Sequence, residues 1–162
     1  MNKWIQFTPS RFGNFIVSFF MMQAIQLLEE AGCSKDVIIA SALALFIPWK
    51  RSQDEQYHVI SERISAALLD PTINSLVCAA CFLAHSYESG QNKSTSIVSD
   101  VSGQYLGIMV AEHLAGSYAY FEYTRYIKHS PGIIRELENP HLIHILAGLI
   151  AGVTSRLYSE GW

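Results

Sequence analysis

Five side chains with oxygen or nitrogen donors fall in or beside two predicted helical segments, 101–128 and 140–158. They are Asp100, Gln104, Glu112, His113 and His144. Asp100 and Gln104 are one helical turn apart, and the next two follow about two turns later, so the spacing predicts one cluster between the two segments. Imidazole favours zinc, iron or nickel, so one interpretation is a transition-metal or polar-ligand site. In the other, Gln104 and His144 hydrogen-bond each other or nearby backbone, and Asp100 is a first-turn acid that favours the helix dipole.

Other patterns that could carry chemistry are weaker. Cys78 and Cys81 form a C-x-x-C pair, the spacing of a redox pair or of half a zinc site. The pair lies inside an apolar helical run without a second pair, which favours two cysteines that act as small core residues. The serines and threonine at 94–96 lack a matching histidine and carboxylate, and no glycine-rich phosphate loop of the G-x-x-x-x-G-K kind is present.

The composition is unusually apolar. Half of the 162 residues are hydrophobic and 15% are charged, against about 25% in an average soluble domain. The alternatives are a membrane protein or a helical protein that buries extra surface by oligomerising. The apolar runs 37–49 and 142–153 are shorter than the roughly 20 residues of a spanning helix, and polar residues dilute the run 12–28. We therefore expect no membrane span.

Charge and cysteine content narrow the surroundings and the partners. The net charge is −3 and no basic run is present, so we expect no nucleic-acid partner. The odd count of three cysteines and the absence of a signal-peptide pattern favour a reducing, cytoplasmic location.

Helix start and stop signals predict an all-α fold, a single-domain bundle of five to six helices over residues 1–162. Ser52 with Glu55 forms a capping box, and Asp70-Pro71 and Asn139-Pro140 each combine an N-cap with proline at the first helical position. Ser34 is a further predicted N-cap, and Gly32 ends the first helix. The predicted helices cover residues 10–31, 34–48, 52–69, 70–87, 101–128 and 140–158, with a short turn of helix at 133–138.

Small residues recur every four positions on the last two long helices. Gly103, Gly107, Ala111 and Ala115 share one face, and the stretch 147–152 carries a similar face. Each glycine costs about 1 kcal/mol of helix propensity relative to alanine. Close approach of two helix axes offsets this cost through additional dispersion contacts, so we predict that these two helices cross at their small faces.

The first predicted helix indicates a partner subunit. Its apolar side chains cover more than one face, so it must be buried most of the way round. These side chains are Phe12, Phe15, Ile16, Phe19, Phe20 and Met22. We expect a homo-oligomer, a dimer or higher.

The last third of the chain resembles the phosphatidylglycerophosphatase A superfamily. The resemblance covers residues 107–158 most clearly, and it is closest to the archaeal branch that includes the alpha-ribazole phosphatases of cobalamin synthesis. The residues that carry it are Phe121, Arg125, Pro131-Gly132-Ile133, the run Ala147–Val153, and Ser155, Arg156 and Tyr158. The resemblance implies a phosphatidylglycerophosphatase A-like fold, hydrolysis of a phosphomonoester with magnesium, and a small phosphorylated ligand.

The chain departs from this family where the metal carboxylates are expected. An Asp-Glu pair should stand where the chain has Gly103-Gln104, and an Asp-Asp pair where it has Ile143-His144. Magnesium prefers hard oxygen ligands, so these four residues would hold it poorly. The sequence therefore leaves three hypotheses. The first is a catalytically degraded relative that binds a ligand or partner, and the second is an active metal-dependent phosphatase with a rearranged site. The third is a helical assembly protein that shares only its packing pattern with the family.

Overall fold

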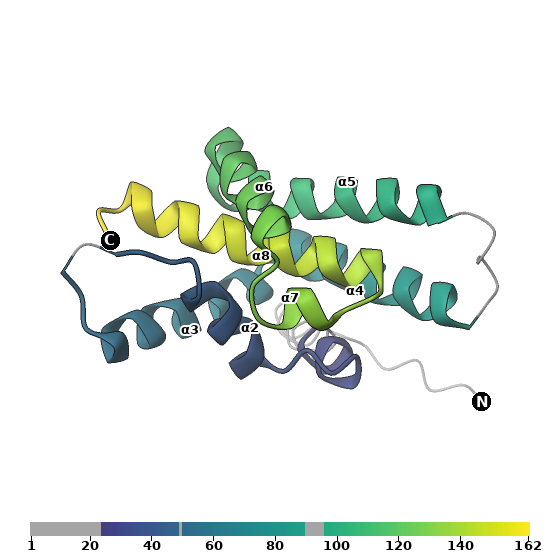
Figure 1. Ribbon diagram of the computed structural model, residues 1–162, viewed down its shortest axis with the longest axis horizontal. Coiled ribbons are helices and arrows are strands. Elements are labelled where there is room, and N and C mark those ends of the chain that lie inside the picture. The colour runs from purple at the N-terminus through teal and green to yellow at the C-terminus, as the bar shows by residue number, and fades with distance from the viewer. Residues whose placement is uncertain (1–23, 49, 90–95) are drawn as a thin grey trace, which may run out of the picture.

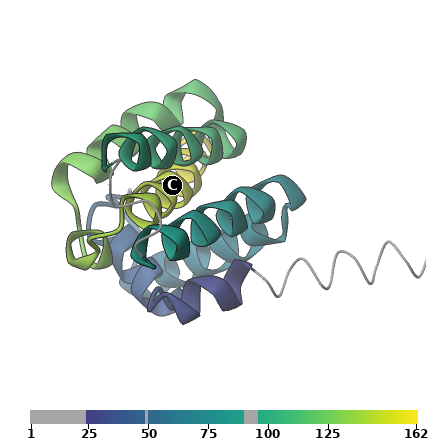
Figure 2. The same cartoon turned by 90° about the vertical axis from the view of Figure 1, so that its right-hand side faces the viewer.

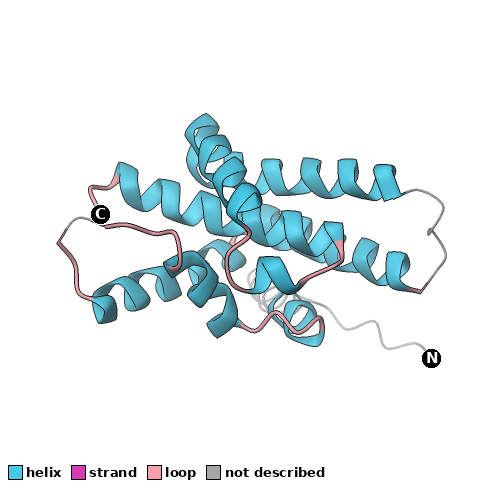
Figure 3. Cartoon of the chain, in the orientation of Figure 1, coloured by secondary structure: helices cyan, strands magenta, loops and turns pink. Residues whose placement is uncertain are grey.

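The computed structural model describes residues 24–48, 50–89 and 96–162, and these residues form helices joined by short loops (Figure 3). No strand occurs among them. Residues 24–30 are helical, and seven α-helices and one 3₁₀ turn follow. In chain order they are α2 (Lys35–Leu43), α3 (Gln53–Leu69), α4 (Pro71–Glu88), α5 (Ser96–Ala115), η1 (Gly116–Tyr118), α6 (Ala119–His129), α7 (Ile133–Glu136) and α8 (Pro140–Ser159). The prediction of an all-α bundle is confirmed.

The predicted caps of three helices are present. At the start of α3, Ser52 Oγ accepts from the Glu55 N–H and a Glu55 carboxylate oxygen accepts from the Ser52 N–H, which completes the capping box. Asp70 Oδ1 accepts from the first backbone N–H groups of α4, and Asn139 Oδ1 accepts from the His141 N–H at the start of α8. Ser34 precedes α2 as predicted, but its side chain makes no capping hydrogen bond.

Helix α8 is the central element of the fold. It contacts each of α2 to α7, which surround it in the view of Figure 2. Its apolar stripe and its small residues are both buried, and the hydrophobic core of the described residues forms around it. In length and composition α8 could cross a membrane, but 78% of its most apolar window is buried inside the fold. Helices α3 and α4 meet those criteria only as a pair bent by 85°.

Helices α5 and α8 cross at their small residues, as predicted. A Cβ added to Gly107 would lie 2.2 Å from the His144 carbonyl oxygen, and one added to Gly148 would lie 2.1 Å from the Gly107 carbonyl oxygen. No side chain fits between backbones that approach so closely. The glycines therefore permit direct contact between the two helices.

Three predicted helix boundaries were wrong. Helix α5 begins at Ser96, five residues before the predicted start at 101, so Asp100 is not the first-turn acid that one interpretation expected. The predicted helix 101–128 is two helices, because Gly116 adopts φ +68° and ends α5, after which α6 turns away in Figure 1. Helix α2 ends at Leu43, five residues before Pro48. The segment after it is held by side chains of α6 and α8, as described below. The predicted first helix lies outside the described residues up to position 23.

Candidate functional site

The predicted cluster of five side chains is only partly assembled. Asp100 Oδ1 lies 3.1 Å from His144 Nε2, so α5 and α8 bring these two residues together. Gln104 is exposed and forms no hydrogen bond with His144, contrary to one of the two interpretations. Glu112 is exposed too, and His113 Nε2 lies 3.3 Å from Asp70 Oδ1 at the other end of α5. Twelve residues of helix separate Asp100 from Glu112 by about 18 Å, which is too far for one small site.

Tyr123 of α6 completes the site on its buried side. Its hydroxyl lies 2.7 Å from His144 Nδ1, and both side chains are buried. Burial, together with the charge of Asp100, raises the pKa of Tyr123, so this side chain stays a phenol. The phenol then donates to Nδ1, and Nε2–H donates to the Asp100 carboxylate. We name this chain of two hydrogen bonds, Tyr123–His144–Asp100, the histidine relay.

The histidine relay runs from the core to the surface. The His144 side chain is 9% exposed, whereas that of Asp100 is 64% exposed. Gly103 lies beside it, because an added Cβ there would be 3.1 Å from His144 Cδ2. Positions 103 and 144 are thus neighbours in space, although they belong to different helices. The site presents one open carboxylate above a fully hydrogen-bonded imidazole.

The residues present do not fit a magnesium ion at this position. Gly103 has no side chain, Gln104 points to solvent, and Ile143 has no donor atom. Both ring nitrogens of His144 are already engaged, by Tyr123 and by Asp100. Within residues 24–48, 50–89 and 96–162, no group of three or more His, Cys, Asp or Glu side chains is placed to hold a metal ion. Magnesium requires several hard oxygen ligands, and here only Asp100 offers them.

A second histidine on the same turn of α8 contacts a serine of α5. Ser102 Oγ lies 2.9 Å from His141 Nε2, and it also donates to the Ser99 carbonyl oxygen. His141 Nδ1 is buried without a hydrogen-bond partner in the described part of the chain. Burial, with the nearby His144, lowers the pKa of His141, which opposes the protonation that a general base needs. Ser102 lies within α5, where backbone N–H groups are occupied, so the pair lacks an oxyanion hole.

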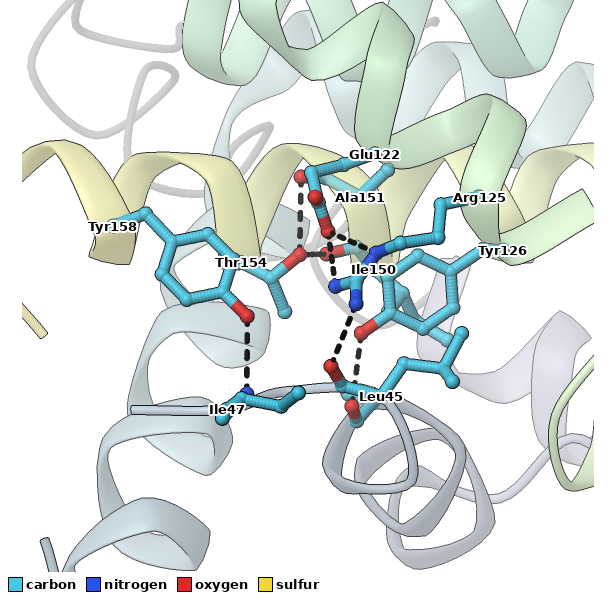
Figure 4. Close-up of polar contacts among 10 residues, drawn as sticks. Leu45, Ile47, Glu122, Arg125, Tyr126, Ile150, Ala151, Thr154 and Tyr158 are labelled. Atoms are coloured by element: carbon cyan, nitrogen blue, oxygen red, sulfur yellow. Dashed lines mark hydrogen bonds and ion pairs between the residues drawn. The ribbon is translucent and has the colours of Figure 1, made fainter. Parts of the chain in front are cut away.

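A second polar network joins α6 and α8 to the segment that follows α2, and Figure 4 shows it. Arg125 forms an ion pair with Glu122, and its Nη1 donates to the Leu45 carbonyl oxygen at 3.0 Å. The Tyr158 hydroxyl accepts from the Ile47 N–H at 3.0 Å. These bonds occupy backbone groups that a longer α2 would have used within the helix. We name this network the arginine clamp: Arg125, which is paired with Glu122, contacts the segment at Leu45, and Tyr158 contacts it at Ile47.

The cysteine pair lies in the core. Cys78 and Cys81 are buried and free, and burial raises the pKa of Cys81 to about 12. A thiol with so high a pKa is a poor nucleophile and a poor metal ligand. The geometry agrees with the core interpretation of the C-x-x-C spacing.

Sequence reasoning missed Tyr123 and Ser102. Tyr123 belongs to an aromatic run, 118–126, whose helical spacing predicts a core or a subunit interface. In the structure Tyr123 and Tyr126 are buried, whereas the exposed members are Tyr118, Tyr120 and Phe121. A buried tyrosine hydroxyl requires a hydrogen-bond partner, so a tyrosine expected in the core indicates a polar group beside it. Ser102 carried no signal, because serine in a helix ordinarily bonds its own backbone.

The fold defines an all-α helical domain built around one buried helix, and two known proteins resemble it. An uncharacterized protein of Methanocaldococcus jannaschii is 25% identical over 126 residues, which are 73% of this chain and 98% of that protein. The solved structure of a protein of unknown function from Bacillus stearothermophilus matches with a TM-score of 0.74 and 19% identity, over 88% of this chain and 95% of that one. This second likeness shows the fold alone. No protein-family model matches the chain.

Proposed function

We propose that this chain is a phosphatidylglycerophosphatase A-like protein, of the alpha-ribazole phosphatase branch, that has lost metal-dependent hydrolysis and acts by binding. The observation that carries the proposal is the state of His144. It stands where the resembled family has an aspartate, and both of its ring nitrogens are used by Tyr123 and Asp100. A side chain so engaged stabilises the helix crossing and has no lone pair left for a metal.

The position of the histidine relay supports this proposal. Positions 103 and 144 adjoin across α5 and α8, as two carboxylate-bearing segments around one metal would have to. This proximity supports the proposal of a site that keeps its packing and has lost its ligands. The family in this proposal rests on the resemblance over residues 107–158, and the two similar proteins carry no stated activity.

The charge of the site limits the ligand that we propose. Its exposed charged group is the Asp100 carboxylate, which accepts hydrogen bonds and repels phosphate. A ligand bound here would present hydroxyl or amine groups to Asp100. A small phosphorylated ligand, as the resemblance implies, would place its phosphate away from this carboxylate.

The test is a hydrolysis assay on the full chain with an aryl phosphate and with alpha-ribazole phosphate, each with magnesium, manganese, zinc or nickel. We expect no phosphate release above the protein-free control. Calorimetric titration with the dephosphorylated nucleoside then measures binding, which Asp100→Asn should weaken and Glu112→Gln should not. Turnover that requires a metal and is abolished in Asp100→Asn would instead establish the alternative, an active phosphatase with a rearranged site.

A further inference from the structure

Helix α5 exposes a continuous stripe of large apolar side chains on the side that faces away from α8. The residues recur at helical spacing, and they are between 42% and 78% exposed. They are Ile97, Val98, Val101, Tyr105 and Met109. No charged residue interrupts this stripe, because Asp100 lies toward His144 on another side of α5. We name these five residues the α5 stripe.

A groove runs beside the α5 stripe, between α5 and α4. It encloses about 520 Å³, and Leu83 of α4 and Leu106 of α5 line it together with four residues of the stripe. Two side-chain hydroxyls are in the lining, those of Tyr105 and Ser102, and the Ser102 hydroxyl is already bonded to His141 and to the Ser99 carbonyl oxygen. Small-molecule sites combine apolar walls with a few convergent polar groups. Among the side chains that line this groove, only Ser102 and Tyr105 carry a polar group, which is few for a small-ligand site.

The apolar area fits a protein partner. The residues of the α5 stripe and Leu83 together expose roughly 700 Å², counting backbone atoms and the Tyr105 hydroxyl, which is comparable with the ~800 Å² that each partner buries in a standard interface. The face offers both a ridge, formed by Tyr105 and Ile97, and the groove beside it. A second copy of the same chain can therefore supply a ridge for each groove about a two-fold axis, which is the most common symmetry of oligomers.

We propose that the α5 stripe and the groove beside it form the interface of a two-fold homodimer. The spacing of Ile97, Val101, Tyr105 and Met109 is four residues, the ridge that interdigitates with its own copy in the most common helix–helix packing. This interface is independent of the proposed function. It also differs from the predicted helix 10–31, on which the sequence alone based its expectation of an oligomer.

The test measures the mass of the full chain by sedimentation equilibrium, from about 1 to 100 µM. Tyr105→Glu is the interface variant, because it places two carboxylates in one apolar contact. Phe121→Glu of α6 is the matched control, since Phe121 is 72% exposed and Tyr105 is 70% exposed. Val101→Glu serves as a second interface variant, and thermal melts establish that all three variants are folded.

We expect the wild type and Phe121→Glu to be dimers, and both interface variants to dimerise at least 100-fold more weakly. A wild-type chain that is monomeric at 100 µM overturns the proposal, including the case of a monomer that instead binds phospholipid vesicles. A dimer that all variants retain also overturns it and places the contact elsewhere, such as on residues 10–31.

Discussion

The histidine relay links α6 to α8, and the arginine clamp links both of these helices to the segment after α2, but the two networks end differently. The arginine clamp ends on backbone groups of Leu45 and Ile47, so every charge in it has a partner within the fold. The histidine relay ends on the Asp100 carboxylate, which is largely exposed. Both contain residues of the segment 107–158.

The exposed end of the histidine relay distinguishes Asp100, whose carboxylate a ligand can reach, from polar side chains that only stabilise the fold. In the arginine clamp, loss of Arg125 would leave the partly buried Glu122 carboxylate and the Leu45 carbonyl oxygen without a donor, and we expect the cost to appear as stability. In the histidine relay, loss of Tyr123 or His144 would likewise leave a partner without its hydrogen bond and lower stability. Asp100, in contrast, can be replaced with little effect on folding. Stability and binding should therefore respond to different residues of the same pair of helices.

The largest effect is expected from Gly107→Ala, which disturbs the frame of the histidine relay. The new Cβ would lie 2.2 Å from the His144 carbonyl oxygen and 3.0 Å from the Tyr123 ring, so α5 and α8 must move apart. Overpacking of this kind costs about 3 kcal/mol or more. Thermal melting should show a fall in Tm of roughly 10 °C. Gly103→Ala, where the closest contact is 2.9 Å, should cost less, and equal melts for the two variants would contradict the account.

Arg125→Leu should break the arginine clamp at a cost of about 2 to 3 kcal/mol. The substitution leaves the Leu45 carbonyl oxygen and the partly buried Glu122 carboxylate without their donor. Urea denaturation measures the free energy of unfolding. The double variant with Glu122→Leu should cost less than the sum of the two single variants, and strict additivity would show that the ion pair is not coupled.

Acid should weaken the fold through His141. Burial lowers the pKa of His141 below its ordinary value of about 6.5, so the unfolded chain binds its proton at a higher pH than the folded chain. Stability is therefore retained above about pH 6.5 and falls as the pH is lowered from there toward the pKa of folded His141. Tm measured between pH 8 and 5 should decline below pH 6.5, and His141→Phe should decline less. An unchanged slope in this variant would assign the acid sensitivity to another group.

Asp100→Asn should have the smallest effect on stability, less than about 1 kcal/mol, because its side chain is mostly exposed. The amide oxygen still accepts from His144 Nε2–H, so the histidine relay keeps its geometry. Chemical denaturation of this variant beside Tyr123→Phe provides the comparison. Tyr123→Phe leaves His144 Nδ1 without a donor and should cost about 1 to 2 kcal/mol. A greater loss in Asp100→Asn would reverse the distinction drawn here.

The sequence predicted helices and their crossing better than it predicted polar contacts. Capping residues act within four positions of each other, so Ser52, Asp70 and Asn139 identified helix starts directly. The glycine spacing on α5 and α8 predicted the crossing, because only backbone contact justifies glycine there. The end of α2 depended on Arg125 and Tyr158, which are about 80 and 111 residues away from their backbone partners in the chain. No local pattern reports such a contact.

The candidate site was half predicted for a similar reason. Asp100 and His144 could be paired once the crossing was known, because both lie on the polar side of the small-residue contact. Glu112 and His113 lie three or more turns from Asp100, and over that length a small error in the helical period rotates a side chain to another face. Gln104 is one turn from Asp100, but its side chain is exposed and does not join the histidine relay. Tyr123 lies at the site because the chain turns at Gly116, where the sequence predicted a continuous helix.

The most direct test of the loss of metal chemistry is a thermal melt of the full chain titrated with magnesium, manganese, zinc and nickel up to millimolar concentrations. A metal bound to the native state must raise Tm by mass action. We predict no shift with magnesium or manganese, since the His144 nitrogens are engaged and only Asp100 offers charged oxygens. A rise in Tm with either metal that disappears in Asp100→Asn and persists in Glu112→Gln would contradict this account and place a working metal site on the histidine relay.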